Sequence, residues 1–433
     1  MDFAFAELSP VSEPSLVFAE NAWLGPRQFA RRVLVGFGGM VDTVARDVSD
    51  AQIPPRAQRV DWLVPGFVNA HCHLEYSWLR NAALPRGTVP FGQWMRAIIS
   101  CRPQSDEDLQ RRADAMAAGA QELLAGGCTA IVDSSTDGSS AKFLAGAGLK
   151  YHVLYEVLGL SRERAEPMLA RALELTARNT NAGLNPHAPY SVGEWLRGAL
   201  KGIADAVPQA WHIAETADEE ELFLRGNGSV AEFLEQFGMQ KPWGSGSAPE
   251  KSSFQFLADA GVLNRCVLAF HGNRLDAREA SFFSAPRGLV HCPATHRWFQ
   301  RAAVPLKQWL QDGVNVCLGT DSLASGETLS MLAMARMAVQ DNADLSANDV
   351  LEMACTNPRK LALWSLPPEK AETGAQGIAV GCAADLVAIS NPALHLLPDG
   401  DVDVAWRELL ADQRSEVAAT WVTGQMRYCS ARP

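Results

Sequence analysis

The sequence lacks the features by which a chain is most readily assigned to a class of protein. No Lys/Arg-rich run occurs in its 433 residues, and 38 basic side chains against 49 acidic ones give a net charge of -11. Nucleic acid is bound through basic patches, so we expect no nucleic-acid partner. No apolar run approaches the length of a membrane span, and we therefore expect no membrane association.

Paired cysteines are missing as well. The nine cysteines are scattered singly, and no CxxC pair occurs. Isolated cysteines within apolar runs are typical of small buried side chains in a reducing compartment. The first ten residues, MDFAFAELSP, carry acids where a secretory signal carries basic residues. We therefore expect a cytoplasmic protein.

The composition is that of an ordinary globular enzyme, with 47% hydrophobic and 20% charged residues and no sign of disorder. The chain is too long for one small domain, and it suits an α/β barrel of about 250 residues with an attached module. Short β-type runs broken by Gly and Pro occupy residues 1–64, and similar runs recur at 377–389 and 416–428. We expect a small β-sandwich built from residues 1–64 and 375–433, flanking a barrel at 65–374.

The middle of the chain alternates between strand-like apolar runs and helical stretches, which favours parallel strands with crossover helices. Eight such runs match the count of a (β/α)8 TIM barrel. They lie at 66–73, 128–134, 151–158, 182–187, 210–215, 266–271, 288–292 and 315–321, with helices expected at 106–125, 162–178 and 229–236 among others. An open doubly wound sheet is the alternative, but it would not make the first and eighth strands neighbours.

The first of these strands ends in a His-x-His pair, within VPGFVNAHCHLEYS at residues 64–77. Side chains alternate between the faces of a strand, so His71 and His73 point to one side and Cys72 to the other. Two neutral imidazoles on one side are a good half of a coordination sphere for zinc or iron. Taken alone the signal is weak, because His-x-His pairs also occur in strands without any chemical role.

Further ligand-type and acid-base residues end the later strands, and barrel enzymes carry their chemistry at these C-terminal strand ends. In a closed barrel, Asp321 on strand 8 lies beside the His pair on strand 1. Structural roles are the alternative, since Asp321 could cap a helix and His212 could be a buried core histidine. The set comprises His71 and His73 (strand 1), His187 (strand 4), His212 and Glu215 (strand 5), His271 (strand 6) and Asp321 (strand 8).

Six motifs in order resemble the amidohydrolase superfamily: VPGFVNAHCHLE, NPHAPYS, HIAETADEE, FHGN, HCPATHRWF and CLGTDSLAS. Within it the chain is similar to the mononuclear deaminases and the related chlorohydrolases. The HCHLE start, the pair Phe91 and Trp94, and the LGTDSLAS ending look most like aminodeoxyfutalosine deaminase, and S-adenosylhomocysteine/methylthioadenosine deaminases are also similar.

The resemblance implies one divalent metal ion, with zinc favoured and ferrous iron as the alternative. Its ligands would be His71, His73, His212 and Asp321. A bridging lysine marks the binuclear branches at the end of strand 4, where this chain has Asn-Pro-His at residues 185–187. The resemblance also suggests a homodimer or larger assembly.

The chemistry expected of such a site is hydrolysis. A bound cation lowers the pKa of water from about 15.7 toward about 7, which makes hydroxide available for attack on an aminated ring carbon. Glu215, a non-ligand carboxylic acid, can protonate the ring nitrogen. Asp321 can take the remaining proton, and His271 can stabilise the intermediate by hydrogen bonding. The predicted function is deamination of a purine-like heterocycle or nucleoside, aminodeoxyfutalosine being one candidate, and the substrate is a small molecule.

Substrate contacts are expected from the loops after the strands. Glu75 could bond a sugar or ring group and Trp94 could stack on a planar base, although both could equally be packing residues. His187 is a third candidate, which could instead shape its loop. His296 and Arg297 stand where adenosine-type deaminases usually show Ser-Asn, and a cation there would suit a carboxylate-bearing substrate.

Two other classes of function stay open at this point. The same site could hydrolyse a cyclic amide or release chloride from a halogenated triazine. A non-catalytic binding protein that has kept the fold is the third reading, and the complete set of ligand and acid-base residues speaks against it.

Overall fold

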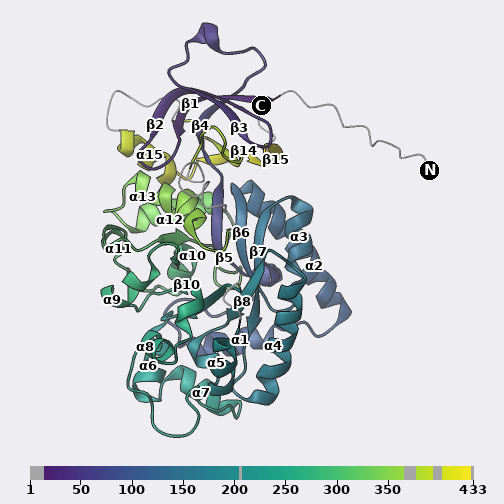
Figure 1. Ribbon diagram of the computed structural model, residues 1–433, viewed down its shortest axis with the longest axis vertical. Helices are drawn as coiled ribbons and strands as arrows, with labels where there is room; N and C mark the ends of the chain where they lie inside the picture. Colours follow the sequence, from purple (N-terminus) through teal and green to yellow (C-terminus); the bar gives the residue numbers. More distant parts are fainter. Residues whose placement is uncertain (1–13, 204–206, 365–376, 394–401, 431–433) are drawn as a thin grey trace, which may run out of the picture.

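The computed structural model describes residues 14–203, 207–364, 377–393 and 402–430, which form two connected parts. In Figure 1 a barrel of strands and helices occupies the lower part, and a β-sheet of purple and yellow strands lies on top of it. No helix within the described ranges has the length and apolar composition that a membrane crossing requires.

The barrel contains all eight predicted strands, joined in the order β12-β11-β10-β9-β8-β7-β6-β5. Every neighbouring pair is parallel. Their bounds are β5 (Phe67–Cys72), β6 (Cys128–Ser135), β7 (Lys150–Val157), β8 (Ala182–Pro186), β9 (Gln209–Ile213), β10 (Cys266–His271), β11 (Gly288–His291) and β12 (Val316–Leu318).

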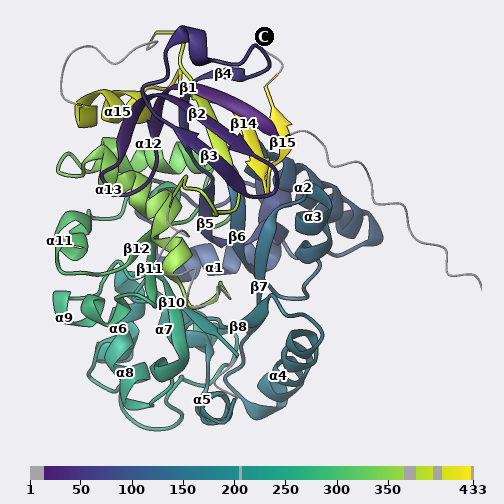
Figure 2. The ribbon, with the colours of Figure 1, turned by 45° about the horizontal axis from the view of Figure 1, so that its top comes forward.

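Helices follow the strands and cover the outside of the barrel (Figure 2). The helices expected at 106–125, 162–178 and 229–236 are present as α2, α4 and α7. The bounds are α1 (Phe91–Ser100), α2 (Asp106–Ala125), α3 (Ser140–Ala147), α4 (Arg162–Ala177), α5 (Glu194–Lys201), α6 (Ala217–Arg225), α7 (Ser229–Gln236), α8 (Ser253–Asp259), α9 (Ala277–Ala280), α10 (Pro293–Trp298), α11 (Leu306–Gln311), α12 (Met331–Asp341), α13 (Ala347–Leu351) and α15 (Val402–Ala411).

The barrel closes between β5 and β12. The backbone N–H groups of Thr320 and Asp321 both donate to the carbonyl oxygen of His71, at 3.1 and 3.0 Å. The Asn69 side chain strengthens this seam, because its amide donates to Thr320 Oγ1 at 2.8 Å and its oxygen accepts from the Thr320 N–H at 3.1 Å. The open-sheet alternative is therefore wrong, and the first and eighth strands are neighbours as predicted.

Apolar side chains fill the interior of the barrel below the strand ends. One buried cluster combines inward-facing residues from successive strands, among them Ala70, Val132, Leu154, Leu268 and Val290. These side chains make the interior a packed core and not a channel. Chemistry is consequently confined to the mouth of the barrel, where the strands end.

The second part is a seven-stranded sheet drawn from both ends of the chain, in the order β15-β14-β13-β4-β1-β2-β3. Phe37 on β2 packs against Trp421 on β14 with ring centroids 6.1 Å apart, although three strands separate β2 from β14 in this order. The sheet must therefore curl over to enclose its own core, which agrees with the predicted sandwich of both chain ends. The bounds are β1 (Ser15–Trp23), β2 (Phe29–Phe37), β3 (Val41–Ala45), β4 (Gln58–Pro65), β13 (Leu386–Ser390), β14 (Glu416–Val422) and β15 (Gln425–Cys429).

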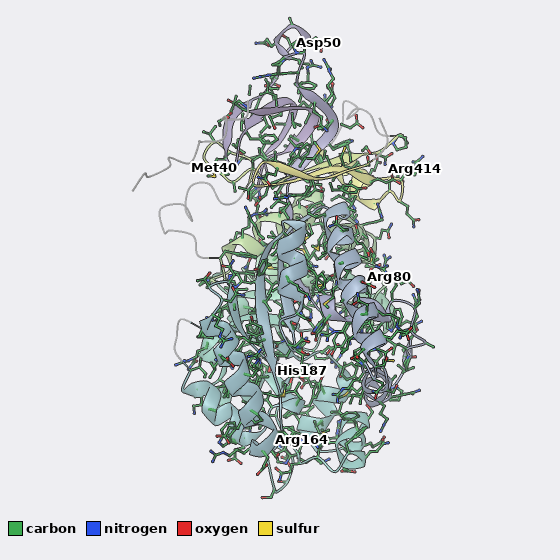
Figure 3. The ribbon with its side chains drawn as sticks, turned by 90° about the vertical axis from the view of Figure 1, so that its right-hand side faces the viewer. Met40, Asp50, Arg80, Arg164, His187 and Arg414 are labelled. Carbon is green, nitrogen blue, oxygen red and sulfur yellow. The ribbon has the colours of Figure 1, made fainter. Side chains whose placement is uncertain are left out.

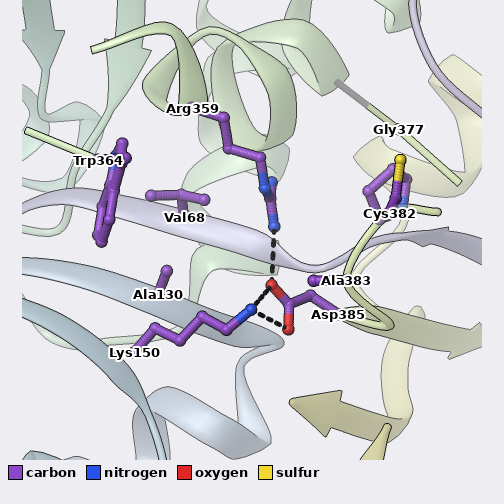
Figure 4. A pocket seen from close by; sticks show the side chains of 10 residues that line it. Val68, Ala130, Lys150, Arg359, Trp364, Gly377, Cys382, Ala383 and Asp385 are labelled. Carbon is purple, nitrogen blue, oxygen red and sulfur yellow. Dashed lines mark hydrogen bonds and ion pairs between the residues drawn. The ribbon is translucent and has the colours of Figure 1, made fainter. Parts of the chain in front are cut away.

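A small cavity marks the joint between the sheet and the base of the barrel (Figure 4). Lys150 Nζ lies 2.6 Å from Asp385 Oδ2, and Arg359 Nη2 lies 3.9 Å from the same oxygen. The cavity measures about 150 Å³, below the usual range of ligand pockets. Val68 and Ala130 line it near the N-terminal ends of their strands, at the opposite end of the barrel from the predicted site.

Asp133, buried on β6, ties this strand to the segment that follows β5. Its Oδ1 accepts from the Leu74 N–H at 2.8 Å. Burial raises the pKa of this carboxyl from 3.8 to about 7. Between these values the folded chain holds a proton that the unfolded chain releases, so the free energy of unfolding falls as the pH rises.

We expect the Asp133→Asn variant to lose less stability than the wild type as the pH is raised from about 5 to about 7. The difference amounts to at most about 1.4 kcal/mol per pH unit. Urea unfolding at several pH values measures it. If the free energy of unfolding falls equally with pH in the two proteins, burial does not raise the pKa of Asp133.

Candidate metal centre and active site

The four predicted metal ligands meet at the mouth of the barrel, and all four are buried. His73 Nε2 lies 3.2 Å from His212 Nε2. Asp321 Oδ1 lies 3.6 Å from His71 Nε2 and 3.9 Å from His73 Nε2. Donor atoms of His71, His73 and Asp321 thus lie within 4.8 Å of one another, and His212 adjoins them through its contact with His73.

The other hydrogen bonds of these residues are made by atoms that point away from the donor set. His212 Nδ1 donates to the His187 carbonyl oxygen at 2.7 Å, which directs the Nε2 lone pair to the common point. Asp321 Oδ2 accepts from Thr295 Oγ1 at 2.8 Å and from Ser325 Oγ at 3.0 Å, while its Oδ1 faces the histidines. Neither ring nitrogen of His71 has a hydrogen-bond partner in the described part of the chain.

This donor set fits one divalent metal ion. Ligand bonds of about 2.0 to 2.1 Å in a tetrahedral arrangement place neighbouring donors about 3.3 Å apart, close to the spacings seen here. Burial lowers the pKa of His73 to about 3 and of His212 to about 4, with mutual repulsion between the two rings adding to the shift on His212. The imidazoles are therefore neutral at pH 7, which is the form that binds metals.

The backbone is strained where the strands end. Ala214, His271 and Asp321 have φ angles of 52°, 71° and 57°, in the left-handed region that non-glycine residues rarely adopt. Such strain persists only where the surroundings enforce it, and it collects at functional sites. Here the three residues stand at the ends of β9 and β10 and after β12, beside the predicted ligands.

Glu215 lies beside the donor set. Within the described residues it belongs to none of the three groups whose donor atoms lie within 4.8 Å of one another, whereas His271 forms such a group with His71 and His212. Glu215 Oε1 is 3.8 Å from His271 Nε2. The main chain of Glu215 is fixed on both sides, because its N–H donates to Glu219 and its carbonyl accepts from Asn273.

A third carboxylate at the site, Glu156 at the end of β7, was not predicted. Its Oε1 lies 3.7 Å from His73 Nδ1, and burial raises its pKa to about 8. With His187 and His212 it makes the third possible ligand group. His187, labelled in Figure 3, thus lies beside Glu156 and His212, and its contact with a substrate stays a prediction. The sequence offered no signal for Glu156, because no motif marks the third strand.

The structure also assigns other partners to Glu75. Its carboxylate is buried and accepts hydrogen bonds from Arg112 Nη2 at 2.7 Å, from Thr136 Oγ1 at 2.6 Å and from Ser135 Oγ at 3.2 Å. Both oxygens are therefore engaged within the protein. The packing alternative describes Glu75 better than contact with a substrate does.

Trp94 lies in a group of aromatic rings on α1 and around α10. Its ring stacks on Phe91 with centroids 5.4 Å apart and meets Phe299 edge to face at 5.6 Å. The indole Nε1 is buried without a hydrogen-bond partner in the described part of the chain. The group forms an apolar wall that reaches Arg301, whose guanidinium lies over the Phe299 ring.

The cation expected after strand 7 is not Arg297. That side chain is partly exposed and pairs with Asp341 on α12 at 2.7 Å, because it occupies the last turn of α10. Arg301, four residues later, points inward, with Nη2 2.6 Å from Glu215 Oε1. His296 donates from Nε2 to Asn273 Oδ1 at 2.7 Å, and Asn273 in turn donates to the Glu215 carbonyl. His296 therefore helps to hold the backbone of Glu215 in place through Asn273.

Comparisons with known proteins agree with this geometry. The model of the Amidohydrolase family matches residues 62–425. A 5-methylthioadenosine/S-adenosylhomocysteine deaminase of Pyrococcus furiosus is 30% identical over an alignment of 358 residues, and the match covers 78% of this chain and 76% of that protein. Two solved structures share the fold. An adenosine deaminase from Xanthomonas campestris with bound zinc has a TM-score of 0.73 at 22% identity, covering 97% of this chain and 95% of its own. Helicobacter pylori aminofutalosine deaminase in complex with methylthio-coformycin has a TM-score of 0.76 at 19% identity, covering 95% of this chain and 99% of its own.

The barrel with a buried set of histidines and carboxylates at its mouth defines a class, the metal-dependent hydrolases. Within that class the chain belongs to the amidohydrolase family, as its motifs predicted.

The hydroxyl of Thr295 holds Asp321 Oδ2, so its loss should weaken metal binding. We expect Thr295→Val to lower the affinity for zinc about 10- to 100-fold, because partners that orient a metal ligand have effects of this size. Competition with a chromogenic chelator measures it. Thr129→Val is the matched control, since Thr129 bonds the Phe67 carbonyl at the start of the barrel strands. Equal zinc affinity in wild type and Thr295→Val would refute the role.

Proposed function

We propose that the chain is an aminohydrolase that removes the amino group of a purine-like ring or nucleoside as ammonia. The ligands of its metal ion would be His71, His73, His212 and Asp321, and zinc is the metal we favour over iron. Imidazole nitrogens and a carboxylate oxygen are ligands that zinc takes in proteins, and this set of side chains therefore supports zinc. The activity named for the Pyrococcus furiosus relative supports an adenosine-like substrate.

One observation carries the proposal. Glu215 is buried within 3.8 Å of His271 yet stands outside the donor set. A carboxylate that stands beside the cation without binding it can take a proton from the water and pass it to the substrate. Glu215 therefore has the position that a proton shuttle needs.

The chemistry follows from these placements. A divalent cation at this site lowers the pKa of bound water toward about 7. Glu215 accepts a proton from the attacking water and delivers it to the ring nitrogen beside the amino-bearing carbon, which makes that carbon electrophilic. The water oxygen bonds to this carbon, and the amino group leaves as ammonia once it has received a further proton.

Two other residues assist at defined atoms. Thr295 and Ser325 hold Asp321 Oδ2, so Oδ1, which faces the histidines, would both bind the metal ion and take the second proton of the water. His271 Nδ1 has no hydrogen-bond partner in the described part of the chain, and Nε2 faces Glu215. Its neutral ring can donate a hydrogen bond to the oxygen that becomes negatively charged during attack.

Ammonia release tests the proposal directly. We expect the zinc-loaded protein to release ammonia from adenosine, 5-methylthioadenosine or S-adenosylhomocysteine, measured by a coupled glutamate dehydrogenase assay. Glu215→Gln should lower kcat about 10²- to 10⁴-fold, because it removes the proton shuttle. Its zinc content should stay at the wild-type value.

The control is Glu232→Gln, an exposed acid on α7 that should leave kcat unchanged. Two outcomes would contradict the proposal. One is release of chloride from a halogenated triazine, or opening of a cyclic amide, with no ammonia from any nucleoside. The other is a fully zinc-loaded protein with no hydrolase activity on any of these compounds.

A further inference from the structure

Arg301 is the charged side chain that contacts Glu215 directly. It follows α10, and its backbone N–H donates to the His296 carbonyl at 3.0 Å. The side chain is only 11% exposed, and Nη2 donates to Glu215 Oε1 at 2.6 Å. A charge-assisted hydrogen bond of this length between buried groups is among the stronger polar contacts in proteins.

Within the described residues, the guanidinium of Arg301 has one polar partner, which is the carboxylate of Glu215. The group lies over the Phe299 ring, 4.7 Å from the centroid, which fixes its plane. Nη1 is buried and makes no hydrogen bond within the described residues. Among those residues, no other carboxylate competes with Glu215 for this cation. The orientation of the pair is therefore set by the aromatic ring on one side and by Glu215 on the other.

Glu215 needs such a partner to work as a proton shuttle. A glutamate side chain has several rotatable bonds, and only one carboxylate oxygen can face the reacting atoms at a time. His271 Nε2 is 3.8 Å from Oε1, beyond hydrogen-bond distance. Arg301 donates to Oε1, and within the described residues Oε2 accepts no hydrogen bond, so we assign proton transfer to Oε2. Holding the carboxylate in one orientation contributes to the rate of the reaction, because a small displacement of a catalytic group lowers that rate strongly.

We propose that Arg301 is the positioning residue of Glu215 in this enzyme. The proposal rests on the proposed function of Glu215 as proton shuttle, and it adds a residue that the sequence motifs do not contain. The loop after strand 7 thus supplies a cation to the acid and not, as Arg297 suggested, to a carboxylate of the substrate.

The test compares Arg301→Met with Arg197→Met. Arg197 is also a buried arginine over a phenylalanine, 4.5 Å from the Phe256 centroid. Its hydrogen bonds within the described residues go to the carbonyl oxygens of Val192 and Pro242. We expect Arg301→Met to lower kcat about 10- to 100-fold, the size of effect that orienting partners usually have, with KM and zinc content unchanged. Arg301→Lys should recover part of the loss, and added guanidinium should raise kcat of Arg301→Met and not of Arg197→Met.

Several results would overturn the proposal. Wild-type kcat in Arg301→Met would do so, as would a loss confined to KM or a loss equal to that of Arg197→Met. If Arg301→Met does not fold, Arg301→Lys and Arg301→Gln replace it, and equal kcat in these two variants counts against a role for the charge.

A structural measurement separates this proposal from the proposed function. A crystal structure of the folded Arg301 variant needs no substrate, and we expect the Glu215 carboxylate to leave its wild-type position there. An unmoved carboxylate overturns the role of Arg301 even if the wild type deaminates nucleosides. A displaced carboxylate supports it even if the reaction turns out to be a different hydrolysis.

Discussion

The seam between the first and last strands of the barrel is the constraint on which the rest of the site depends. Two backbone hydrogen bonds to the His71 carbonyl, with the Asn69 and Thr320 side chains paired beside them, bring the Asp321 carboxylate against the two histidines of β5. These groups are fully or almost fully buried, so opening the seam would leave several polar groups without partners, at about 1 to 3 kcal/mol each. The same bonds that complete the fold therefore complete the donor set.

Burial shapes the chemistry of the mouth as much as the identity of the residues does. The low polarity of the surroundings keeps the imidazoles in their neutral form, because burial depresses the pKa of His71, His73 and His212. It has the opposite effect on Glu156, whose pKa rises. A doubly charged cation placed among these groups would therefore bind without having to displace protons from the histidines.

The sequence was sufficient for the parts of the structure that repeat. Each barrel strand is an apolar run, and a ligand-type residue at its end can be located by counting, so the His pair and Asp321 could be predicted together. Contacts that depend on how a turn directs a side chain could not be predicted from the sequence. Arg297 and Arg301 are four residues apart, and only the end of α10 at Trp298 turns one outward and the other inward. Glu75 follows His73 closely, yet the 3-10 helix at Leu74–Leu79 carries its carboxylate to Arg112 on α2. Such partners come from distant segments, and no local pattern encodes them.

The curled sheet has a consequence for how the chain is made. β4, near the start, pairs on one side with β1 and on the other with β13, which leaves the ribosome only after the whole barrel has been synthesised. Until then one edge of β4 exposes unpaired backbone groups, and an open strand edge is a template for association with other chains. The pairing also joins segments far apart in sequence, which slows folding. Nascent chains of this protein would accordingly be most vulnerable to aggregation in the interval before their last strands emerge.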